Sequence, residues 1–366
     1  MKTLSRAIRR RVPYPLKLLR ARAIQRTGLW RERAASRRKL ILFLVPGREY
    51  ISGGILSIFS LYRFSRSLEQ IHGARVLMCF YPGEAHSVLR YRMFQNDVLI
   101  YPFEMVLRVC ARAQQVLLHI PEYALSEVIS RLGSPYLTDL RRHQGLRINI
   151  LNQNIQSMPD RAVVQSLAQL VPDLTMTTAH PRYSTREQRE YWGVPLHHLP
   201  AWTRPDHDPP DAFETKRDLL LVSPDPSPYR AEILGMLKTK LPGLDIRVIQ
   251  NLPYEEYTKL EHAAKWALTF GEGMDGYFAG TFDRGGIGFA VYNDEFFTPE
   301  YRDLRTVYPS FDALRERMVE DLLALDNKAA LESYNAQVRA LIVRGWGPEK
   351  TQAALAAFYR GEYTYP

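Results

Sequence analysis

Hydrophobic and polar positions follow two different periods in alternating stretches along the chain. Short apolar runs that end at turn residues predict buried strands, and longer stretches with apolar residues three or four positions apart predict helices. In the first half of the chain the predicted strands are residues 39–45, 74–81, 98–103, 115–120, 146–151 and 174–178. Helices are predicted between them at residues 55–71, 104–113, 125–132, 160–170 and 187–192. This alternation indicates a doubly wound parallel α/β sheet.

The same alternation starts again after a break in the pattern. Residues 200–216 contain four prolines and four acidic residues with little apolar periodicity, which indicates a linker between domains. A chain of 366 residues is long enough for two domains, each with its own core. Ser310 is expected to cap the first of two or three closing helices. Strands of the second half are predicted at residues 218–222, 245–250, 266–270 and 287–292.

One glycine-rich stretch, residues 269–292, combines the features of a ligand-binding turn. A predicted strand leads to Glu272 between Gly271 and Gly273, and a helix is expected to begin near Gly276. Glycines let the backbone approach a ligand closely, and the free amides of a helix N-terminus bind anions. Glu272 would then accept hydrogen bonds from sugar hydroxyls. The alternative is an ordinary glycine-rich turn between a strand and a helix.

This stretch resembles the donor-site signature of retaining glycosyltransferases with the GT-B fold. That signature reads apolar strand, Glu-Gly, a second Glu eight positions after the first, and a closing strand of the type Gly-x-Pro-Val-Val. Glu272 and Gly273 match its first part, and Gly-Ile-Gly-Phe-Ala-Val at residues 286–291 stands at the closing strand. The resemblance implies that Glu272 is a catalytic-site residue that positions the donor sugar.

The chain departs from that family at the second carboxylate. Gly280 stands where the family has the Glu that holds the ribose of the nucleotide. Asp275 and Asp283 are the acids that could take over this role. The departure leaves a second interpretation open, in which the chain is a GT-B-like partner protein without catalytic activity.

Other parts of the sequence resemble donor-binding elements of the same family. Gly53 and Gly54 follow the first predicted strand, as a double-glycine loop does in many GT-B enzymes, although a plain glycine turn fits as well. Arg230 lies in a loop where the family has an Arg or Lys for the nucleotide diphosphate, and its fixed fork of donors suits phosphate oxygens. The donor-binding residues implied by the resemblance are Arg230, Gly271, Gly273, Asp275, Gly276, Gly53 and Gly54.

A catalytic histidine and acceptor-binding residues are expected in the first domain. His119 opens the sequence His-Ile-Pro-Glu at the end of a predicted strand, where the family often has His-x-His-Glu with a histidine over the reacting sugar. A histidine at a strand end is also common as a structural residue. The candidates for the acceptor side are Asn152, Asn154 and His180. Amide side chains both donate to and accept from hydroxyls, but they also form turns.

The positive charge of the chain is concentrated near its start. Residues 1–40 contain 14 Lys or Arg and one acid, Glu32, whereas the remaining residues carry 35 basic and 38 acidic side chains. Interleaved apolar residues predict a discontinuous amphipathic helix on an anionic membrane surface, broken by Pro13 and Pro15. A solvated tail and nucleic-acid binding are the alternatives. The interleaved residues are Ile8, Tyr14, Leu16, Leu18, Leu19, Ile24, Leu29 and Trp30.

The sequence predicts no membrane-spanning helix, signal peptide, metal site or disulfide. The apolar run at residues 40–45 is far shorter than the ~20 residues that span a bilayer, and no signal cleavage site follows it. Cys79 and Cys110 occur in apolar contexts that fit the reduced thiols of a cytoplasmic protein. Asp206 and Asp208 form an Asp-x-Asp pair, but no apolar strand precedes them, which favours a solvated linker.

The resemblance implies a GT-B protein, in which two Rossmann-like doubly wound domains face a cleft. The implied activity is a retaining, metal-independent hexosyl transfer from a nucleotide sugar to a glycan or lipid-linked glycan in bacterial surface polysaccharide synthesis. No cofactor and no nucleic-acid partner are expected. A nucleotide-sugar epimerase of the same fold is a further alternative.

The expected organisation follows from the pattern and the resemblance together. A basic membrane-proximal arm at residues 1–38 precedes an acceptor domain at residues 39–200 and a linker at residues 201–216. A donor domain at residues 217–345 is followed by a crossover helix at residues 346–366. With such an arm, the protein is expected in the cytoplasm, bound peripherally to the inner face of the cell membrane.

Overall fold

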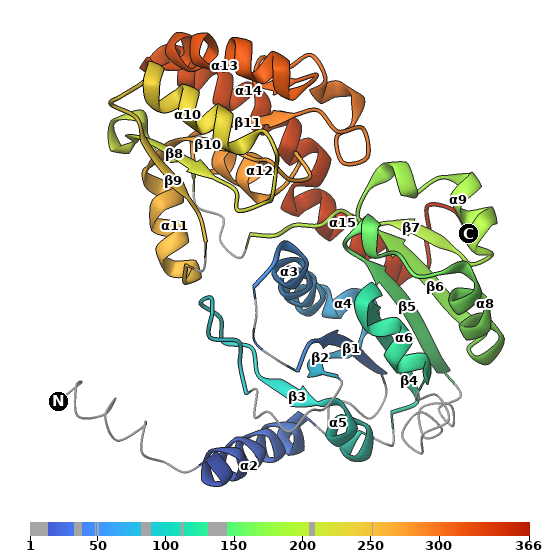
Figure 1. Ribbon diagram of the computed structural model, residues 1–366. Coiled ribbons are helices and arrows are strands. Elements are labelled where there is room, and N and C mark those ends of the chain that lie inside the picture. The colour runs from blue at the N-terminus through green and yellow to red at the C-terminus, as the bar shows by residue number, and fades with distance from the viewer. Residues whose placement is uncertain are drawn as a thin grey trace. The chain divides into compact units, whose positions relative to one another are not determined.

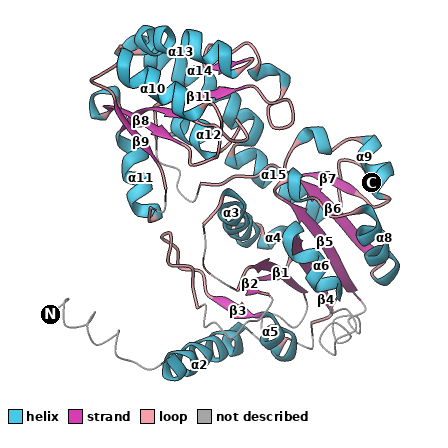
Figure 2. Ribbon diagram, viewed as in Figure 1, coloured by secondary structure: helices cyan, strands magenta, loops and turns pink. Residues whose placement is uncertain are grey.

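The computed structural model describes residues 14–32, 39–47, 49, 51–81, 89–110, 113–130, 145–204, 209–250 and 252–366. The chain forms two compact units, unit 1 with Met1–Ala201 and Thr351–Pro366, and unit 2 with Trp202–Lys350 (Figure 1). In both units helices surround a central sheet (Figure 2). The Asp206 and Asp208 pair of the linker lies outside the described residues, as do residues 1–13 and 33–38 of the predicted arm.

Unit 1 is built on a parallel sheet of seven strands in the order β3-β2-β1-β4-β5-β6-β7. In the centre of the sheet Leu42 of β1 lies between Leu77 of β2 and Leu118 of β4. All residues of β1 except Lys39 are buried, as expected for a parallel strand that is covered on both faces. The strands are β1 (Lys39–Val45), β2 (Arg75–Phe80), β3 (Ile100–Pro102), β4 (Gln115–Pro121), β5 (Gly145–Asn152), β6 (Asp173–Thr178) and β7 (Leu196–His198).

The helices of unit 1 follow the predicted pattern with two local differences. The helix expected at residues 55–71 is divided at Leu68, whose N–H donates to both Phe64 O and Ser65 O and thereby tightens the last turn. Ser184 and Glu187 have the spacing of a capping box, but the residue that caps the helix at Arg186–Trp192 is Thr185. The helices are α2 (Tyr14–Glu32), α3 (Gly53–Ser67), α4 (Glu69–His72), α5 (Phe103–Val109), α6 (Glu122–Ser130), η2 (Ile155–Ser157), α8 (Arg161–Leu170), η3 (Pro181–Tyr183) and α9 (Arg186–Trp192).

Unit 2 has a parallel sheet of five strands in the order β12-β11-β10-β8-β9. Trp266 of β10 is fully buried at its centre, between Leu220 of β8 and Ile287 of β11. The order reverses between β8 and β10, so the neighbouring connections leave the sheet there on opposite sides. The strands are β8 (Arg217–Val222), β9 (Asp245–Val248), β10 (Ala264–Leu268), β11 (Ile287–Val291) and β12 (Val307–Tyr308).

Helices cover the sheet of unit 2 and lead back to unit 1. Ser310 Oγ accepts a hydrogen bond from Ala313 N at 3.2 Å, which confirms the predicted cap of α13. The last residues belong to unit 1, where Tyr365 pairs with Leu196 of β7. The helices of unit 2 are η4 (Phe213–Thr215), α10 (Arg230–Lys240), α11 (Tyr254–Ala263), α12 (Gly276–Asp283), η5 (Pro299–Tyr301), α13 (Phe311–Leu325) and α14 (Lys328–Trp346). Helix α15 (Pro348–Arg360) follows them and belongs to unit 1 from Thr351 on.

Three further features bear on the predictions. Cys79 and Cys110 are buried free thiols, as predicted. None of the helices in the described ranges combines the length and apolar character needed to cross a bilayer. Within the same ranges, no three His, Cys, Asp or Glu side chains gather in a way that could hold a metal ion.

Candidate functional site

The candidate site lies in unit 2, at the edge of the sheet where the parallel strands end. Open α/β sheets bind ligands outside the carboxyl ends of their strands. The loops after β8 and β10 are joined there, because Phe270 N donates to Ser223 Oγ at 2.9 Å and Ser223 N donates to Leu268 O at 3.0 Å. The Glu272 loop is therefore held against the loop that leads to Arg230.

Two glycines make this loop possible. Gly273 has a φ of +89°, and a Cβ at this position would lie 2.4 Å from the ring of Phe297. A Cβ on Gly271 would lie 2.7 Å from Oδ2 of Asp225, so the carboxylate of Asp225 lies directly against the loop. The sequence pattern did not single out Asp225, which comes from the β8 loop. Close packing thus favours glycine at both positions, and the backbone conformation favours it at Gly273 as well.

Glu272 is partly buried among other acidic groups. Burial raises the pKa of Glu272 to about 7, and the nearby carboxylates of Asp275, Asp225 and Glu295 act in the same direction. A carboxyl group with this pKa exchanges its proton near neutral pH. It can accept a hydrogen bond from a hydroxyl when ionised and donate one when protonated.

Asp275 caps the helix that follows the loop. Its Oδ1 accepts hydrogen bonds from Tyr277 N at 2.8 Å and Phe278 N at 3.0 Å, and its other oxygen accepts one from Thr269 Oγ1. Helix α12 begins at Gly276 as predicted. However, Asp275 already binds two of the amides that were expected to face an anion, which corrects the prediction of an open helix N-terminus.

Arg230 lies at the same edge as the first residue of α10. Its Nη2 donates to Ser223 O at 3.3 Å, and its guanidinium group stands 5.6 Å from the ring centre of Phe270. The Nε atom is buried and has no hydrogen-bond partner in the described part of the chain. The structure therefore brings together Arg230 and the Glu272 loop, which are more than 40 positions apart in sequence.

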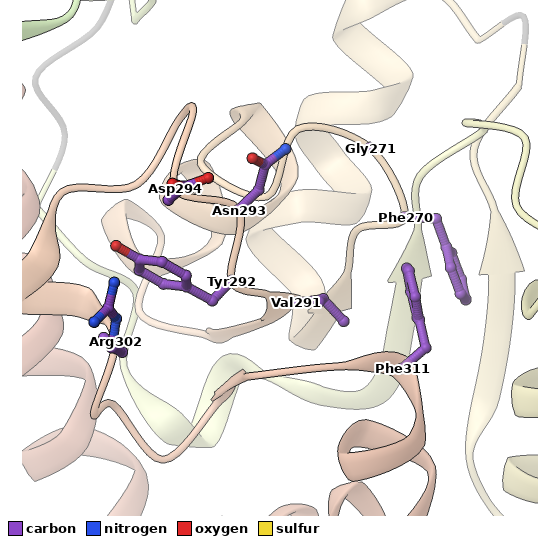
Figure 3. A pocket seen from close by; sticks show the side chains of 8 residues that line it. All are labelled: Phe270, Gly271, Val291, Tyr292, Asn293, Asp294, Arg302 and Phe311. Carbon is purple, nitrogen blue, oxygen red and sulfur yellow. The ribbon is translucent and has the colours of Figure 1, made fainter. Parts of the chain in front are cut away.

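A pocket of about 500 Å³ adjoins the loop at Phe270 and Gly271 (Figure 3). The rings of Phe270 and Phe311 are stacked with centres 5.8 Å apart, and Arg302 lies over Tyr292 at 5.0 Å. The sequence analysis missed the residues that the β11 loop and the start of α13 contribute. The full lining is Phe270, Gly271, Val291, Tyr292, Asn293, Asp294, Arg302 and Phe311.

In unit 1 the predicted acceptor residues mostly serve the backbone. Asn154 Oδ1 accepts from Gln156 N at 2.9 Å, and His180 Nδ1 accepts from Arg182 N at 3.2 Å. Both side chains therefore cap short 3-10 helices. Asn152 Nδ2 donates to a strand carbonyl, that of Thr177, at 3.1 Å. Its Oδ1 is buried without a hydrogen-bond partner among the described residues.

The double glycine lies at this same edge of unit 1. Gly53 and Gly54 begin α3, which Ser52 caps by accepting a hydrogen bond from Ile55 N at 3.3 Å. A Cβ on Gly54 would lie in ordinary contact, 3.8 Å, with the side chain of Gln153. Neither polar atom of the Gln153 amide has a hydrogen-bond partner within the described ranges. Gln153 thus joins Gly54 and Asn152, although the sequence analysis did not select it as a site residue.

His119 belongs to the core of unit 1. Its ring is fully buried, stacked on Phe43 with ring centres 4.4 Å apart, and its Nδ1 lies 3.1 Å from Asn149 Nδ2. Phe358 of α15 covers it at a centre distance of 5.6 Å. Burial lowers the pKa of His119 to about 3. The predicted catalytic contact is corrected, because a ring enclosed in this way has no surface for a substrate.

Comparison with known proteins identifies the architecture. No protein-family model and no curated protein matches the sequence. Sucrose-phosphate synthase from Thermosynechococcus elongatus matches the structure with a TM-score of 0.54 at 10% identity, over 88% of this chain and 99% of that chain. Anabaena HepE in complex with UDP-glucose matches with a TM-score of 0.53 at 9% identity, over 88% and 99%. The fold is GT-B.

A third similar structure carries the description of a different class of enzyme. It is a protein from Listeria monocytogenes described as a UDP-N-acetylglucosamine 2-epimerase, with a TM-score of 0.53 at 11% identity over 88% of this chain and 97% of that chain. At identities near one residue in ten, these likenesses establish the fold and leave the activity to the site residues.

Other side chains occupy the space beside Gly280, the position at which the GT-B signature has its second Glu. A Cβ on Gly280 would lie 2.4 Å from Nη2 of Arg204 and 2.6 Å from Oε1 of Glu261. Arg204 is buried and pairs with Glu261 at 2.7 Å and with Asp283 at 3.1 Å. Asp283 is thus committed to a buried ion-pair network and Asp275 to the helix cap. Neither acid that could substitute for the second Glu is open to a ribose.

Proposed function

We propose that this protein is a glycosyltransferase that takes a sugar from a nucleotide-sugar donor bound to unit 2. The observation that carries the proposal is the convergence of Glu272, Arg230 and an aromatic pocket at one edge of the sheet. The pocket of about 500 Å³ has the size typical of small-ligand sites, and its wall combines aromatic rings with polar and charged side chains. The complex of HepE with UDP-glucose supports a donor of this chemical class.

In this proposal each group has a defined role. Glu272 accepts hydrogen bonds from donor-sugar hydroxyls and fixes the orientation of the ring. The unpartnered Nε of Arg230 supplies a buried donor for a diphosphate oxygen, and the positive charge stabilises the leaving group. The stacked rings of Phe270 and Phe311 offer an apolar face to the donor. The reaction is proposed to retain configuration and to need neither a metal nor a cofactor, by resemblance to the family.

The proposed acceptor is a glycan or lipid-linked glycan in bacterial surface polysaccharide synthesis. The concentration of basic residues near the start of the chain supports a location at the cytoplasmic face of the cell membrane, where such acceptors are built. At the edge of unit 1, the unpartnered atoms of Asn152 and Gln153 are the groups that we assign to acceptor hydroxyls. No nucleic acid is required.

A second candidate function is favoured by the ribose position. Because Arg204 fills the space beside Gly280 and Asp275 caps α12, unit 2 lacks two features that help GT-B transferases hold a nucleotide. A non-catalytic GT-B-like partner protein would tolerate these changes. A nucleotide-sugar epimerase is the remaining alternative, and it is distinguished by turnover of the donor without an acceptor.

A thermal-shift panel of UDP-, GDP- and CMP-linked sugars tests the proposed function. A ligand that binds the native state stabilises it by RT ln(1 + [L]/Kd), so a true donor raises Tm in a dose-dependent way. Glu272→Gln should lose most of that shift. Glu316→Gln, an exposed carboxylate on α13, is the matched control and should keep it. No shift with any sugar nucleotide would favour the non-catalytic partner.

A further inference from the structure

Helix α2 is seated firmly on unit 1 through one of its faces. Ala21, Gln25 and Leu29 are buried, and Gln25 Nε2 donates to Ile100 O of β3 at 2.7 Å. A Cβ on Gly28 would lie 2.9 Å from the hydroxyl oxygen of Tyr101, so the helix backbone approaches β3 closely. Figure 1 shows α2 beside α5 and β3. This part of the predicted arm is therefore a fixed element of the folded unit.

The opposite face of α2 carries large apolar side chains in contact with water. Leu16 is 54% exposed, Leu19 is 61% exposed and Trp30 is 70% exposed. Their spacing continues through Ala23 and Thr27, so all five positions lie along one side of the helix. Four of the ten large exposed apolar residues in the described chain belong to this helix, the fourth being Ile24. Such a concentration marks an interaction surface.

Arginines flank the apolar line on both sides. Arg20, Arg22, Arg26 and Arg31 are all exposed, and none of them forms an ion pair in the described part of the chain. The one acidic residue of the helix, Glu32, turns toward unit 1 and accepts a hydrogen bond from Arg75 Nη2 at 2.7 Å. The outward face is thus purely basic around its apolar centre.

We propose that this face of α2 docks unit 1 on an anionic lipid bilayer, with the helix lying in the plane of the membrane. Leu16, Leu19 and Trp30 enter the headgroup layer while the arginines contact lipid phosphates. A second copy of the chain is the poorer partner, because the same basic faces would repel each other. Nucleic acid would match the charge and leave the leucines in water.

This inference does not depend on the proposed reaction, and it revises the sequence-based picture of the arm. Leu29 was expected to reach the lipid but is fully buried in unit 1, and Leu18 is half-buried. The lipid contact is therefore one face of a rigidly held helix, so it fixes which side of unit 1 turns toward the membrane.

Vesicle flotation of the full chain tests the proposal. The chain should float with vesicles that contain phosphatidylglycerol and stay behind with pure phosphatidylcholine. The combined variant Leu16→Ser, Leu19→Ser and Trp30→Ser should weaken binding by roughly tenfold or more, and each Arg→Gln change on this face by about fivefold at low salt. The matched control is the pair Leu323→Ser and Val248→Ser, which removes exposed apolar residues from unit 2 and should leave binding unchanged.

Trp30 gives a second measurement that does not rely on loss of binding. Brominated lipids quench tryptophans that enter the bilayer. Of the other four tryptophans, Trp192, Trp202 and Trp266 are buried and Trp346 of unit 2 is half-buried. We expect quenching on vesicle binding that disappears in Trp30→Phe. Vesicle binding that persists in the combined variant, or a bound protein whose Trp30 is not quenched, would overturn the proposal. The proposal would also be overturned if the combined variant bound vesicles as tightly as the unchanged chain and lost only its binding to RNA or DNA.

Discussion

The two units present the same kind of sheet edge and use it differently. In unit 2 the pKa of Glu272 is raised to about 7, Arg230 Nε is buried with no hydrogen-bond partner among the described residues, and a pocket adjoins the Glu272 loop. In unit 1 most polar side chains at the corresponding edge form hydrogen bonds with the backbone. Asn154 and His180 cap short helices, and Asn152 donates to a strand carbonyl. The difference shows that a polar residue after a strand serves the backbone unless the loop around it is built to expose it.

The glycines at the two edges differ in how tightly they are packed. At Gly271 a side chain would collide with Asp225 from the loop after β8, and at Gly273 it would collide with Phe297 from the segment after β11. At Gly54 a side chain would meet only ordinary contacts. The glycines of unit 2 are therefore required by the architecture of the loop, and Gly54 is not.

The largest expected effect comes from restoring the family's second carboxylate. Gly280→Glu places a side chain into the space of Arg204 and Glu261, so we expect a loss of about 3–5 kcal/mol in the free energy of unfolding of unit 2. Gly235→Ala in α10 has open space around it and should change stability by at most about 1 kcal/mol, in the favourable direction. Chemical denaturation measures both. A stable Gly280→Glu protein with improved nucleotide binding would contradict the assignment of this space.

His119 provides a pH test of unit 1. The folded state holds the neutral ring with a pKa of about 3, whereas the unfolded chain protonates it near the ordinary value of 6.5. The unfolded state therefore binds more protons between these values, and stability should fall by up to about 1.4 kcal/mol per pH unit as the pH drops below 6.5. Above pH 6.5 this contribution should be constant.

His119→Leu should flatten that slope and leave sugar-nucleotide binding to unit 2 unchanged. His72 and His197, whose pKa values burial also lowers, remain and account for the residual slope. Denaturation across a pH series provides the readout. If His119→Leu abolished sugar transfer while the fold and its stability were retained, the correction of the histidine's role would itself be wrong.

The sequence predicted most strands of the two sheets, because parallel strands are short apolar runs such as β1 that can be recognised locally. It missed β12, whose two residues are too short to form a recognisable run. The sequence also predicted where α12 begins. Asp275, directly before Gly276, is a residue type that commonly caps helices, but the resemblance implied that it binds the donor. The pocket could not be predicted in this way. Arg302 and Phe311 come from segments 30 or more positions beyond Glu272, and only the packing of unit 2 brings them to the loop.

Replacement of Arg230 in unit 2 should have a smaller effect, and that effect should be on donor binding. Arg230→Ala should weaken donor binding by roughly 10–100-fold, because a buried hydrogen bond to a charged ligand is lost. The donor affinity of Arg230→Lys should lie between those of the wild type and Arg230→Ala. Arg217→Ala, at the opposite end of β8 with a side chain 61% exposed, is the control and should bind normally. Calorimetric titration provides the affinities, and equal Kd values for the two alanine variants would remove Arg230 from the site.

The smallest expected effect concerns a cap in unit 1. Asn154→Ala should cost about 1 kcal/mol of unit 1 stability, the usual contribution of a capping side chain. Acceptor kinetics should change little, whereas Gln153→Ala, which alters an amide without partners, should raise the KM for the acceptor. A strong kinetic effect of Asn154→Ala at unchanged stability would return that residue to the acceptor side.

The most direct test of the central claim is calorimetric titration of the best-stabilising sugar nucleotide into the wild type and Glu272→Gln between pH 5.5 and 8.5. The wild type should bind it at one site, with affinity falling about tenfold per pH unit below pH 7, as Glu272 becomes protonated. Glu272→Gln should bind more weakly, with no such pH dependence. Identical isotherms for the two proteins at every pH would contradict the assignment of the donor site to this edge of unit 2.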